Sequence, residues 1–460
     1  MGTRFSAEGI LPGDVVGVML PNWREWLVAC VATQQAGAVM LPIVSIYGAK
    51  ELRFILEQSK AKMLITPDQW REVDYAAVVA DCGALSHLKH HIRLGNTFSA
   101  LEADGAIVAS VLRNPDDLAM LFYTSGTTAD PKGVMHSSRT ILAELSTQQM
   151  SRAAIENETI LTPWPPGHVA GALSLLRFLA HGVPIVAMDQ WNAAVAANLI
   201  DRHKVTTSSG TPFHLSGIVE TADRGGHDLS SLRNYIVGAA PVPSALVERC
   251  LAQGLAVYHC YGSSEHPTVT SGTADDALDK QLHTEGRVIA GSELRFVDDD
   301  GCDVPTGNEG EITTRGGELF IGYLDARLND DAFLPGGWYR TGDIGRLDAD
   351  GYLVITDRKK DIIIRGGENI SSKEVEEVLL RHPAVADAAV VAAADERMGE
   401  VVRACVILAS GTDLTLEDIR KHFIAAGIAK QKIPERLSIL ETLPRNASGK
   451  VLKHELRANL

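Results

Sequence analysis

The sequence predicts an α/β fold in which helices cover mainly parallel β-sheets, because short apolar runs alternate with helical runs over the first 360 residues. Runs rich in β-branched and aromatic residues favour buried strands, namely DVVGVML, MLITP, LAMLFYTS, VPIVAM, NYIVGAA and LAVYHCYG. Three other stretches have the composition of helices, EWLVACVATQQAG, AKELRFILEQSKA and PSALVERCLAQG. The first and third end at glycine, a frequent residue just beyond a helix C-terminus.

Two changes in texture divide the chain further. From about Gln281 turns and short strands predominate, as in SELRFVDDDGCDVPTGNEGEITTRG, which is typical of a small antiparallel unit. The charged residues, isoleucine triplet and glycine pair of DRKKDIIIRGGENISS then suit a linker. After it, SKEVEEVLLRH, ADAAVVAA, VVRACVIL and TLEDIRKHFIAAG indicate a small α+β domain. We predict a large domain over residues 1–357, a hinge over 358–361 and a small mobile domain over 362–460.

Composition narrows the class of protein. The 460 residues are 45% hydrophobic and 22% charged, as in soluble globular proteins. No apolar run is long enough to span a bilayer, and the N-terminus lacks the apolar core of a signal peptide, so we expect a cytoplasmic protein. A net charge of −15 argues against a nucleic-acid partner. The six cysteines are scattered without C-x-x-C or metal-ligand spacing, which indicates a reducing compartment and no structural zinc.

The stretch YTSGTTADPKGVMHS, Tyr123 to Ser137, has the composition of an anion-binding loop. It follows an apolar strand and offers many N–H and O–H donors. It also contains two glycines and a lysine. It is not the P-loop pattern G-x-x-x-x-G-K-[ST], because Pro131 stands where that pattern has glycine and Gly133 where it has Ser or Thr. The loop therefore predicts phosphate binding of another kind.

Six motifs in sequence carry a resemblance to a known family: YTSGTTADPKG, PPGHVAG, YGSSE, YRTGDIG, DRKKDIIIRGGENIS and PRNASGKVLK. In this order they resemble the adenylate-forming superfamily, in its acyl-CoA synthetase branch, from about Leu11 to the C-terminus. The resemblance implies a large N-terminal domain and a mobile C-terminal lid. It also implies two half-reactions, in which ATP and an acid give an acyl-adenylate and a thiol then takes the acyl group. ATP, Mg²⁺ and coenzyme A are the implied cofactors and co-substrate.

The same resemblance implies a nucleotide site. The pyrophosphate side of ATP would be lined by Thr124, Ser125, Gly126, Thr127, Thr128 and Lys132. The adenine would be bordered by Gly238, Ala239 and Ala240, with Tyr261 stacked on the ring, and Gly262 and Ser264 after Tyr261 would also belong to the nucleotide site. Asp343 would accept hydrogen bonds from both ribose hydroxyls, for which a carboxylate is well suited. Arg358 would reach the ribose and phosphate, and Glu265 would bind Mg²⁺.

Further roles concern the lid and the acid. By resemblance, Lys360 occupies the hinge, Gly366 and Gly367 border the tunnel for the pantetheine thiol, and Lys450 bridges the α-phosphate and the substrate carboxylate. His168 would border and gate the acid pocket, although a histidine simply packed in a Pro/Gly-rich loop remains an alternative. Lys450, Glu265, Thr127 and His168 are the implied catalytic residues.

The acid itself is the least constrained partner. The stretches HVAGAL, SSGTPFH and VGAAPV would border it, and they are small and apolar with no fixed cation. We therefore expect an apolar monocarboxylic acid rather than an amino acid or a dicarboxylate. The stretch MLPNWREWLVA and the residues after it look most like ligases for alicyclic, medium-chain or steroid side-chain acids.

Two other functions stay open at this point. A carrier-loading adenylation enzyme is the main rival to a CoA ligase, and no carrier segment follows Leu460. The other is a truncated, inactive paralogue with a binding or regulatory role, against which the intact motif residues argue. Relatives carry several dozen more residues before LPGDVVGVMLPN, so we expect the short N-terminus to lower stability more than chemistry. A homodimer is compatible with the sequence.

Overall fold

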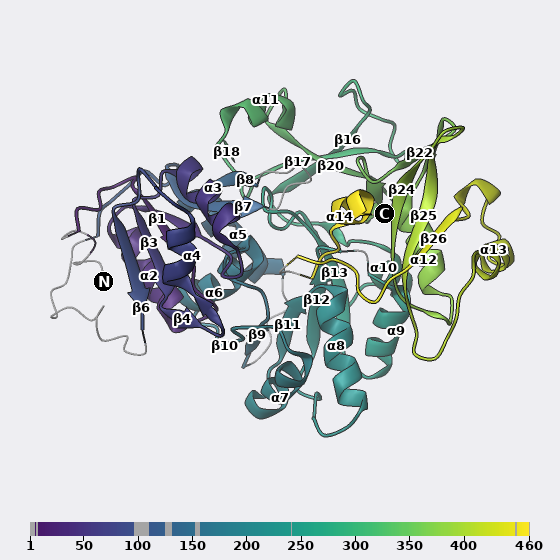
Figure 1. Ribbon diagram of the computed structural model, residues 1–460, viewed down its shortest axis with the longest axis horizontal. Helices are drawn as coiled ribbons and strands as arrows, with labels where there is room; N and C mark the ends of the chain where they lie inside the picture. Colours follow the sequence, from purple (N-terminus) through teal and green to yellow (C-terminus); the bar gives the residue numbers. More distant parts are fainter. Residues whose placement is uncertain are drawn as a thin grey trace.

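The computed structural model describes residues 5, 8–95, 110–124, 131–151, 157–240, 242–446 and 449–459. In these parts the chain builds four main β-sheets with helices packed against them (Figure 1). Three of the sheets come from the residues before the predicted hinge and the fourth from those after it. No helix among the described residues is long and apolar enough to cross a membrane.

The first sheet is built on parallel strands in the order β7-β2-β1-β3-β6, and two antiparallel strands, β8 and β18, extend one edge. Its strands are apolar on both faces. In β3, for example, Met63 and Ile65 belong to one core and Leu64 to another. The strands are β1 (Val15–Val18), β2 (Val39–Pro42), β3 (Met63–Pro67), β6 (His90–Leu94), β7 (Leu118–Thr124), β8 (Lys132–Ser137) and β18 (Gly322–Tyr323), and the neighbouring helices are α2 (Arg24–Gln35), α3 (Ala49–Ser59), α4 (Tyr75–Asp81), α5 (Ser138–Ser151) and α6 (Val169–His181).

The second sheet has parallel strands in the order β10-β9-β11-β12-β13, continued by antiparallel β14 and β15. Helices α7, α8 and α9 cover it at the lower side of Figure 1. Its strands are β9 (Ile160–Thr162), β10 (Ile185–Ala187), β11 (Thr207–Gly210), β12 (Asn234–Gly238), β13 (Ala256–Tyr261), β14 (Thr270–Ser271) and β15 (Arg287–Val288), and its helices are α7 (Ala193–His203), α8 (Pro212–Asp223), α9 (Ser244–Ala252) and α10 (Leu278–His283).

The third sheet is antiparallel, in the order β16-β17-β20-β19, with β21 paired to β20. It confirms the small antiparallel unit that the sequence predicts after Gln281. The strand β21 leads directly into the predicted hinge. The elements are β16 (Ser292–Val297), β17 (Gly310–Gly316), β19 (Phe333–Leu334), β20 (Trp338–Leu347), β21 (Leu353–Arg358) and the short helix α11 (Asn329–Ala332).

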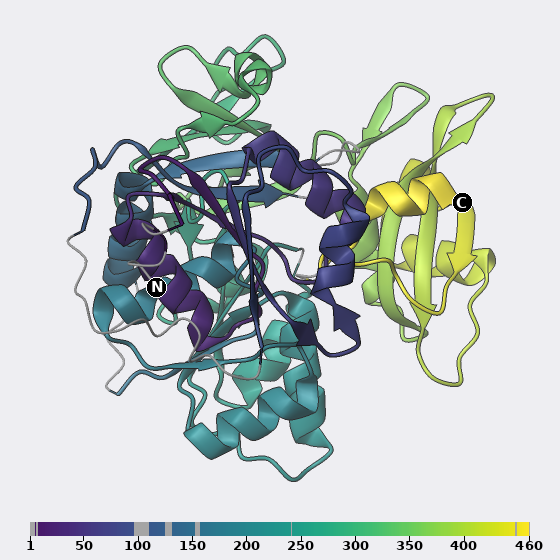
Figure 2. The same ribbon diagram turned by 60° about the vertical axis from the view of Figure 1, so that its left-hand side comes forward.

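The fourth sheet forms a unit beside the rest of the chain, drawn in light green to yellow in Figure 2. Its strands run in the order β23-β22-β25-β24, and β26 pairs parallel to β25. Its apolar core comes from residues of this unit alone. The elements are β22 (Ile363–Arg365), β23 (Glu368–Ile370), α12 (Ser372–Leu380), β24 (Val385–Asp395), β25 (Gly399–Leu408), α13 (Leu416–Ala425), β26 (Arg436–Ile439) and α14 (Lys453–Asn459).

The predicted elements agree with the structure in type, with two corrections. The strand in VPIVAM, β10, is not buried, because it lies at the edge of the second sheet. The other correction concerns the predicted linker. Residues 359–361 form a turn, but the isoleucine run and the glycine pair form a tight hairpin instead. Gly366 and Gly367 are its two-residue loop, with φ of +58° and +91°. Positive φ at both loop residues is what this hairpin turn requires, and glycine adopts it without steric cost. The domain boundaries stay a prediction.

Candidate active site

The side chains of Asp343, Tyr261 and Arg358 meet where the second and third sheets adjoin. Tyr261 Oη donates to Asp343 Oδ2 at 2.7 Å, and Arg358 Nε lies 2.7 Å from Asp343 Oδ1. The sheet explains the second contact, because Asp343 on β20 and Arg358 on β21 are direct cross-strand partners. Asp343 is buried, and a buried charge needs a partner. The guanidinium of Arg358 compensates it.

Lys450 comes to this cluster from the C-terminal unit. The charge of Arg358, together with burial, lowers the pKa of Lys450 to about 7, and Asp343 acts in the opposite direction. The backbone N–H of Lys450 donates to Asn446 Oδ1 at 2.9 Å, which fixes the chain just before the lysine. Gly449 has a φ of +81°, and a Cβ there would lie 3.1 Å from Thr211 Oγ1. Glycine thus lets this loop approach the start of α8.

Lys360 and its neighbours form the turn between β21 and β22. The N–H of Asp361 donates to the carbonyl of Arg358 at 2.8 Å. Burial and the charge of Arg358 lower the pKa of Lys360 to about 8. The predicted hinge residue therefore lies next to the same cluster that Lys450 joins.

Glu265 is buried beside two tyrosines. Tyr323 Oη donates to Glu265 Oε1 at 2.7 Å and lies 3.2 Å from Tyr339 Oη. Lys132 Nζ lies 5.2 Å from the centroid of the Tyr323 ring, within cation–π distance. One tyrosine therefore connects the carboxylate predicted to bind Mg²⁺ with the lysine predicted to bind phosphate.

The predicted phosphate loop lies between β7 and β8. Thr124 and Lys132 pair across the two strands and hold its ends together. Four predicted residues of the loop, Ser125, Gly126, Thr127 and Thr128, lie outside the described residues.

His136, just after this loop, contacts the YGSSE motif. Its Nε2 lies 2.8 Å from the carbonyl oxygen of Ser264, which makes Nε2 the donor, and its Nδ1 accepts from Thr140 Oγ1 at 3.0 Å. Burial lowers the pKa of His136 to about 4, so the ring is neutral. A buried histidine thus ties the YGSSE turn to the strand that carries Lys132.

Two glycines predicted at the nucleotide site stand where a larger residue would not fit. A Cβ on Gly238 would lie 2.6 Å from the carbonyl oxygen of Cys260, and one on Gly262 would lie 1.9 Å from that of Pro267. Ala239 has a φ of +63°, uncommon for a residue with a Cβ. Such strained positions gather at functional sites. Ala240 follows it, half-buried at the end of the same turn.

His168 precedes α6 and is held neutral. Its Nε2 is buried and has no hydrogen-bond partner among the described residues. Burial lowers the pKa of His168 to about 4. The ring is therefore a neutral group at physiological pH. This observation fits a pocket wall, and the packed-histidine alternative stays open.

Gly366 and Gly367 are not brought to the Asp343 cluster. They form the β22–β23 turn, where the N–H of Gly366 donates to the carbonyl of Met398 at 2.8 Å. A Cβ on Gly366 would lie 2.6 Å from Met398 Cε. In this orientation of the C-terminal unit their contacts are within that unit.

Sequence reasoning missed Tyr323 and Tyr339. Both are buried; Tyr323 ends the stretch LFIGY, outside the six motifs, and Tyr339, for which the sequence predicts no role, is the first residue of the motif YRTGDIG. Burial raises the pKa of Tyr323 well above its usual range, so the hydroxyl stays a donor to Glu265. No local pattern marks the contact of Tyr323 with Glu265, because it joins segments far apart in the sequence. The pairing of β18 with β8 and the hydrogen bond from the N–H of Phe320 to the carbonyl of Glu265 hold these segments together.

The sequence matches the AMP-binding enzyme family over residues 1–324 and the AMP-binding enzyme C-terminal domain over residues 374–450. It is 35% identical to the medium-chain fatty-acid–CoA ligase of Escherichia coli, over 99% of this chain and 82% of that protein. It is 31% identical to the 2-succinylbenzoate–CoA ligase of Bacillus cereus, over 98% of this chain and 89% of that protein.

Solved structures of CoA synthetases are also similar to this chain. The o-succinylbenzoate CoA synthetase of Bacillus subtilis, in complex with its acyl-adenylate intermediate, superposes with a TM-score of 0.86 at 28% identity, over 99% of this chain and 90% of that chain. The same enzyme has also been solved with ATP and a magnesium ion, with a TM-score of 0.85 at 28% identity, over 99% of this chain and 91% of that chain.

The family match and these relatives place the chain among the enzymes of the acid–thiol ligase class. The chain belongs to the family of AMP-binding enzymes, as the resemblance of its motifs indicated.

Proposed function

We propose that this protein ligates an apolar monocarboxylic acid to coenzyme A, in the cytoplasm, through an acyl-adenylate made from ATP. The observation that carries the proposal is the meeting of Lys450 with Arg358 and Asp343, which brings the C-terminal unit to the buried nucleotide cluster. ATP, Mg²⁺, coenzyme A and the acid are then its small-molecule partners.

The first half-reaction needs charge neutralisation. An oxygen of the acid attacks the α-phosphorus of ATP, a P–O bond forms, and the bond to the departing pyrophosphate breaks. The ammonium of Lys450 and the guanidinium of Arg358 would stabilise the negative charge that gathers there. Lys132 would do so at the pyrophosphate, and Asp343 would hold the ribose.

The described residues fit a magnesium ion that is bound mainly by the nucleotide. They contain no cluster of three or more metal-ligating side chains, and Glu265 is the carboxylate beside Lys132 and Tyr323. Mg²⁺ commonly takes one or two carboxylates together with substrate phosphates. Bound there, it would offset phosphate charge, while Tyr323 keeps the Glu265 carboxylate oriented.

In the second half-reaction the sulfur of the thiol attacks the acyl carbonyl, a C–S bond forms, and AMP leaves with the electrons of the C–O bond. The thiol proton passes to solvent or to the released phosphate. Gly366 and Gly367 are the residues we propose beside this thiol, after the lid turns about Lys360.

The residues predicted to border the acid support an apolar substrate. His168 and His214 are the ionisable groups in those stretches, and burial lowers the pKa of each to about 4. Neither therefore supplies a cation for a second carboxylate near pH 7. Arg445 lies 5.5 Å from the Phe213 ring, but its charge is compensated by Asp387 at 2.5 Å.

The proposal is tested first with a panel of free acids, ATP, Mg²⁺ and coenzyme A. Medium-chain and alicyclic acids should give the highest rates of AMP formation. A strong preference for an amino acid or a dicarboxylate would refute the acid assignment. Replacing coenzyme A by carrier proteins tests the carrier-loading alternative, and absence of ATP–pyrophosphate exchange with every acid would favour an inactive paralogue.

Lys450→Ala then tests the site. Removing a positioned donor of this sort costs about 10²–10³ in rate, so pyrophosphate release from ATP and acid should nearly cease. The same variant should convert synthetic acyl-adenylate and coenzyme A to thioester at close to the unmodified rate. Equal losses in both reactions, in a folded protein, would exclude Lys450 as the adenylation lysine.

A further inference from the structure

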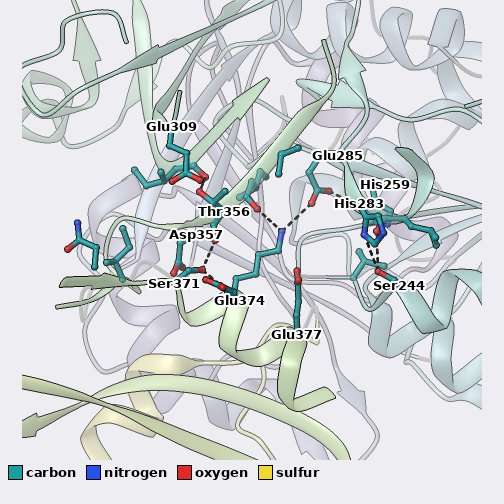
Figure 3. Close-up of a pocket in the computed structure, with 18 of the residues that line it drawn as sticks. Ser244, His259, His283, Glu285, Glu309, Thr356, Asp357, Ser371, Glu374 and Glu377 are labelled. Atoms are coloured by element: carbon teal, nitrogen blue, oxygen red, sulfur yellow. Dashed lines mark hydrogen bonds and ion pairs between the residues drawn. The ribbon is translucent and has the colours of Figure 1, made fainter. Parts of the chain in front are cut away.

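A cavity of about 500 Å³ lies between helix α12 of the C-terminal unit and the second and third sheets. Figure 3 shows its two sides, with His259 and Glu285 on one and Glu374 and Glu377 of α12 on the other. Several side chains that line the cavity also make contacts between the C-terminal unit and the rest of the protein. None of these contacts belongs to the nucleotide cluster.

Lys373 of α12 makes two of the crossing contacts. Its Nζ donates to the carbonyl of Ile355 on β21 at 2.8 Å and lies 3.7 Å from Glu285 Oε1. The two side chains are only 19% and 14% exposed, so solvent screens this ion pair less than a surface pair. Lys373 thus joins the C-terminal unit to the body of the protein through a sheltered charge.

Glu285, the partner of Lys373, also lies beside His259. Its Oε2 lies 3.5 Å from His259 Nδ1. Burial opposes ionisation, but the neighbouring His259 and Lys373 outweigh it and hold the pKa of Glu285 below its ordinary value. His259 stands on β13 two residues before Tyr261, so the ion pair ends on the strand that carries the nucleotide cluster.

Two further hydrogen bonds support the same arrangement. Ser371 Oγ donates to the carbonyl of Thr356 at 2.7 Å, and the N–H of Ser372 donates to Asp357 Oδ2 at 2.6 Å. Both bind the first turn of α12 to β21, just before the turn at Lys360. Rotation about Lys360 would have to separate Lys373 from Glu285.

We propose that Lys373 and Glu285 are positioning residues that hold the C-terminal unit in the orientation where Lys450 reaches the Asp343 cluster. The pair favours the first half-reaction and opposes the rotation needed for the second. This inference rests on the proposed function, because it requires two half-reactions with different orientations of the unit. A contact made in only one of two states shifts their equilibrium by its own free energy.

The test compares both half-reactions in the full-length enzyme. Lys373→Met removes the charge but keeps an apolar stem, so adenylation, measured as pyrophosphate release, should fall about tenfold. Thioester formation from synthetic acyl-adenylate should be unchanged or faster. Lys373→Arg keeps a charged donor and should retain adenylation, and Lys421→Met, an exposed lysine of α13, is the matched control.

Three results would overturn the proposal: equal losses in both half-reactions, no loss in either, or a loss in Lys373→Arg as large as in Lys373→Met. Glu285→Gln tests the other partner without altering α12 and should show the same selective loss, so an unchanged rate of adenylation there would also overturn it. Failure of the proposed function is distinguishable, because the unmodified enzyme would then show no pyrophosphate exchange with any acid.

Discussion

At the scale of residues, the charge of Lys450 depends strongly on its neighbours. The charge of Arg358, burial and the charge of Lys360 destabilise the protonated form of Lys450, while Asp343 and Asp361 stabilise it. The net effect lowers the pKa of Lys450 to about 7. Before ATP binds, the ammonium is therefore partly deprotonated near neutral pH. The polyphosphate of ATP would restore the proton by adding negative charge beside it.

This pKa predicts the pH dependence of the first half-reaction. The ratio kcat/KM for ATP reports the free enzyme, so it should fall as the pH rises through about 7, where Lys450 loses its proton. Pyrophosphate exchange measured from pH 6 to 9 provides the profile. Lys450→Arg keeps its charge over this range, so its profile should be flat even if its rate is lower. A fall that persists in Lys450→Arg would point to another group, such as Lys360, whose pKa is about 8.

A second residue-scale feature lies away from the cluster, in a pair of buried carboxyl groups. Glu318 follows β17, and Glu144 on α5 accepts a hydrogen bond from Thr268 Oγ1 at 2.7 Å. Burial, a hydrogen bond to Glu144 and the charge of Glu144 raise the pKa of Glu318 far above its usual range. Glu318 is thus protonated and donates to the Glu144 carboxylate.

Glu318→Gln should make the protein more stable in alkali. A carboxyl whose folded pKa is raised contributes most below its unfolded value, and its contribution declines as the pH rises above that value. Glutamine donates to Glu144 at every pH, so the variant should gain about 1–3 kcal/mol near pH 8 and little at pH 4. Thermal unfolding of both proteins at the two pH values measures this difference. Parallel pH profiles for the two proteins would show that Glu318 is not protonated in the fold.

At the scale of elements, local patterns predicted most of the fold. The helix predicted from AKELRFILEQSKA is α3, and the run MLITP is β3, because hydrophobic periodicity follows directly from which face is buried. For the glycine pair after Arg365 the sequence predicts a linker, because glycine alone does not distinguish a hairpin turn from a flexible segment. Pairing β22 with β23 decides between them.

The candidate site was predictable only where residues lie within motifs. The motifs indicated Asp343, Tyr261 and Arg358, and the structure brings these three together. The contact of Tyr323 with Glu265 depends on strands far apart in the sequence, so no local pattern contains it. Long-range contacts of residues outside the motifs are therefore not predicted by local patterns of the sequence.

The turn after β21 gives the element-scale prediction. Proline at position 360 would fix φ near −65° and also restrict Lys359, so rotation of the C-terminal unit should be impeded. We expect Lys360→Pro to slow thioester formation far more than adenylation, because the present orientation already brings Lys450 to the cluster. Separate assays of the two half-reactions measure the ratio. Lys360→Ala keeps the turn flexible and is the control, and equal losses in a folded Lys360→Pro variant would remove the hinge assignment.

At the scale of the whole molecule, each apolar core lies entirely on one side of the predicted hinge. The clusters centred on Trp26, Tyr235, Leu52 and Ile312 contain only residues before it. The clusters of the fourth sheet, around Phe423 and Cys405, contain only residues after it. Polar contacts such as that of Lys373 with Glu285 join the two parts. Two units with separate cores and a polar border are expected to fold independently and to move relative to one another.

A protein ending at residue 361 should therefore fold without the C-terminal unit. Its three sheets and its Asp343–Tyr261–Arg358 cluster are complete, so it should unfold cooperatively and bind ATP. It lacks Lys450, so its rate of adenylation should fall by about 10²–10³, as in Lys450→Ala. Calorimetry and ATP binding measure the first expectation, and pyrophosphate exchange the second, with the full-length Lys450→Ala variant as control. If the shortened protein is unfolded while that control is folded, the large domain needs the C-terminal unit for its stability and the boundary at residues 358–361 is wrong. If it folds and still adenylates at the full rate, the charge supplied by Lys450 is not required for the first half-reaction.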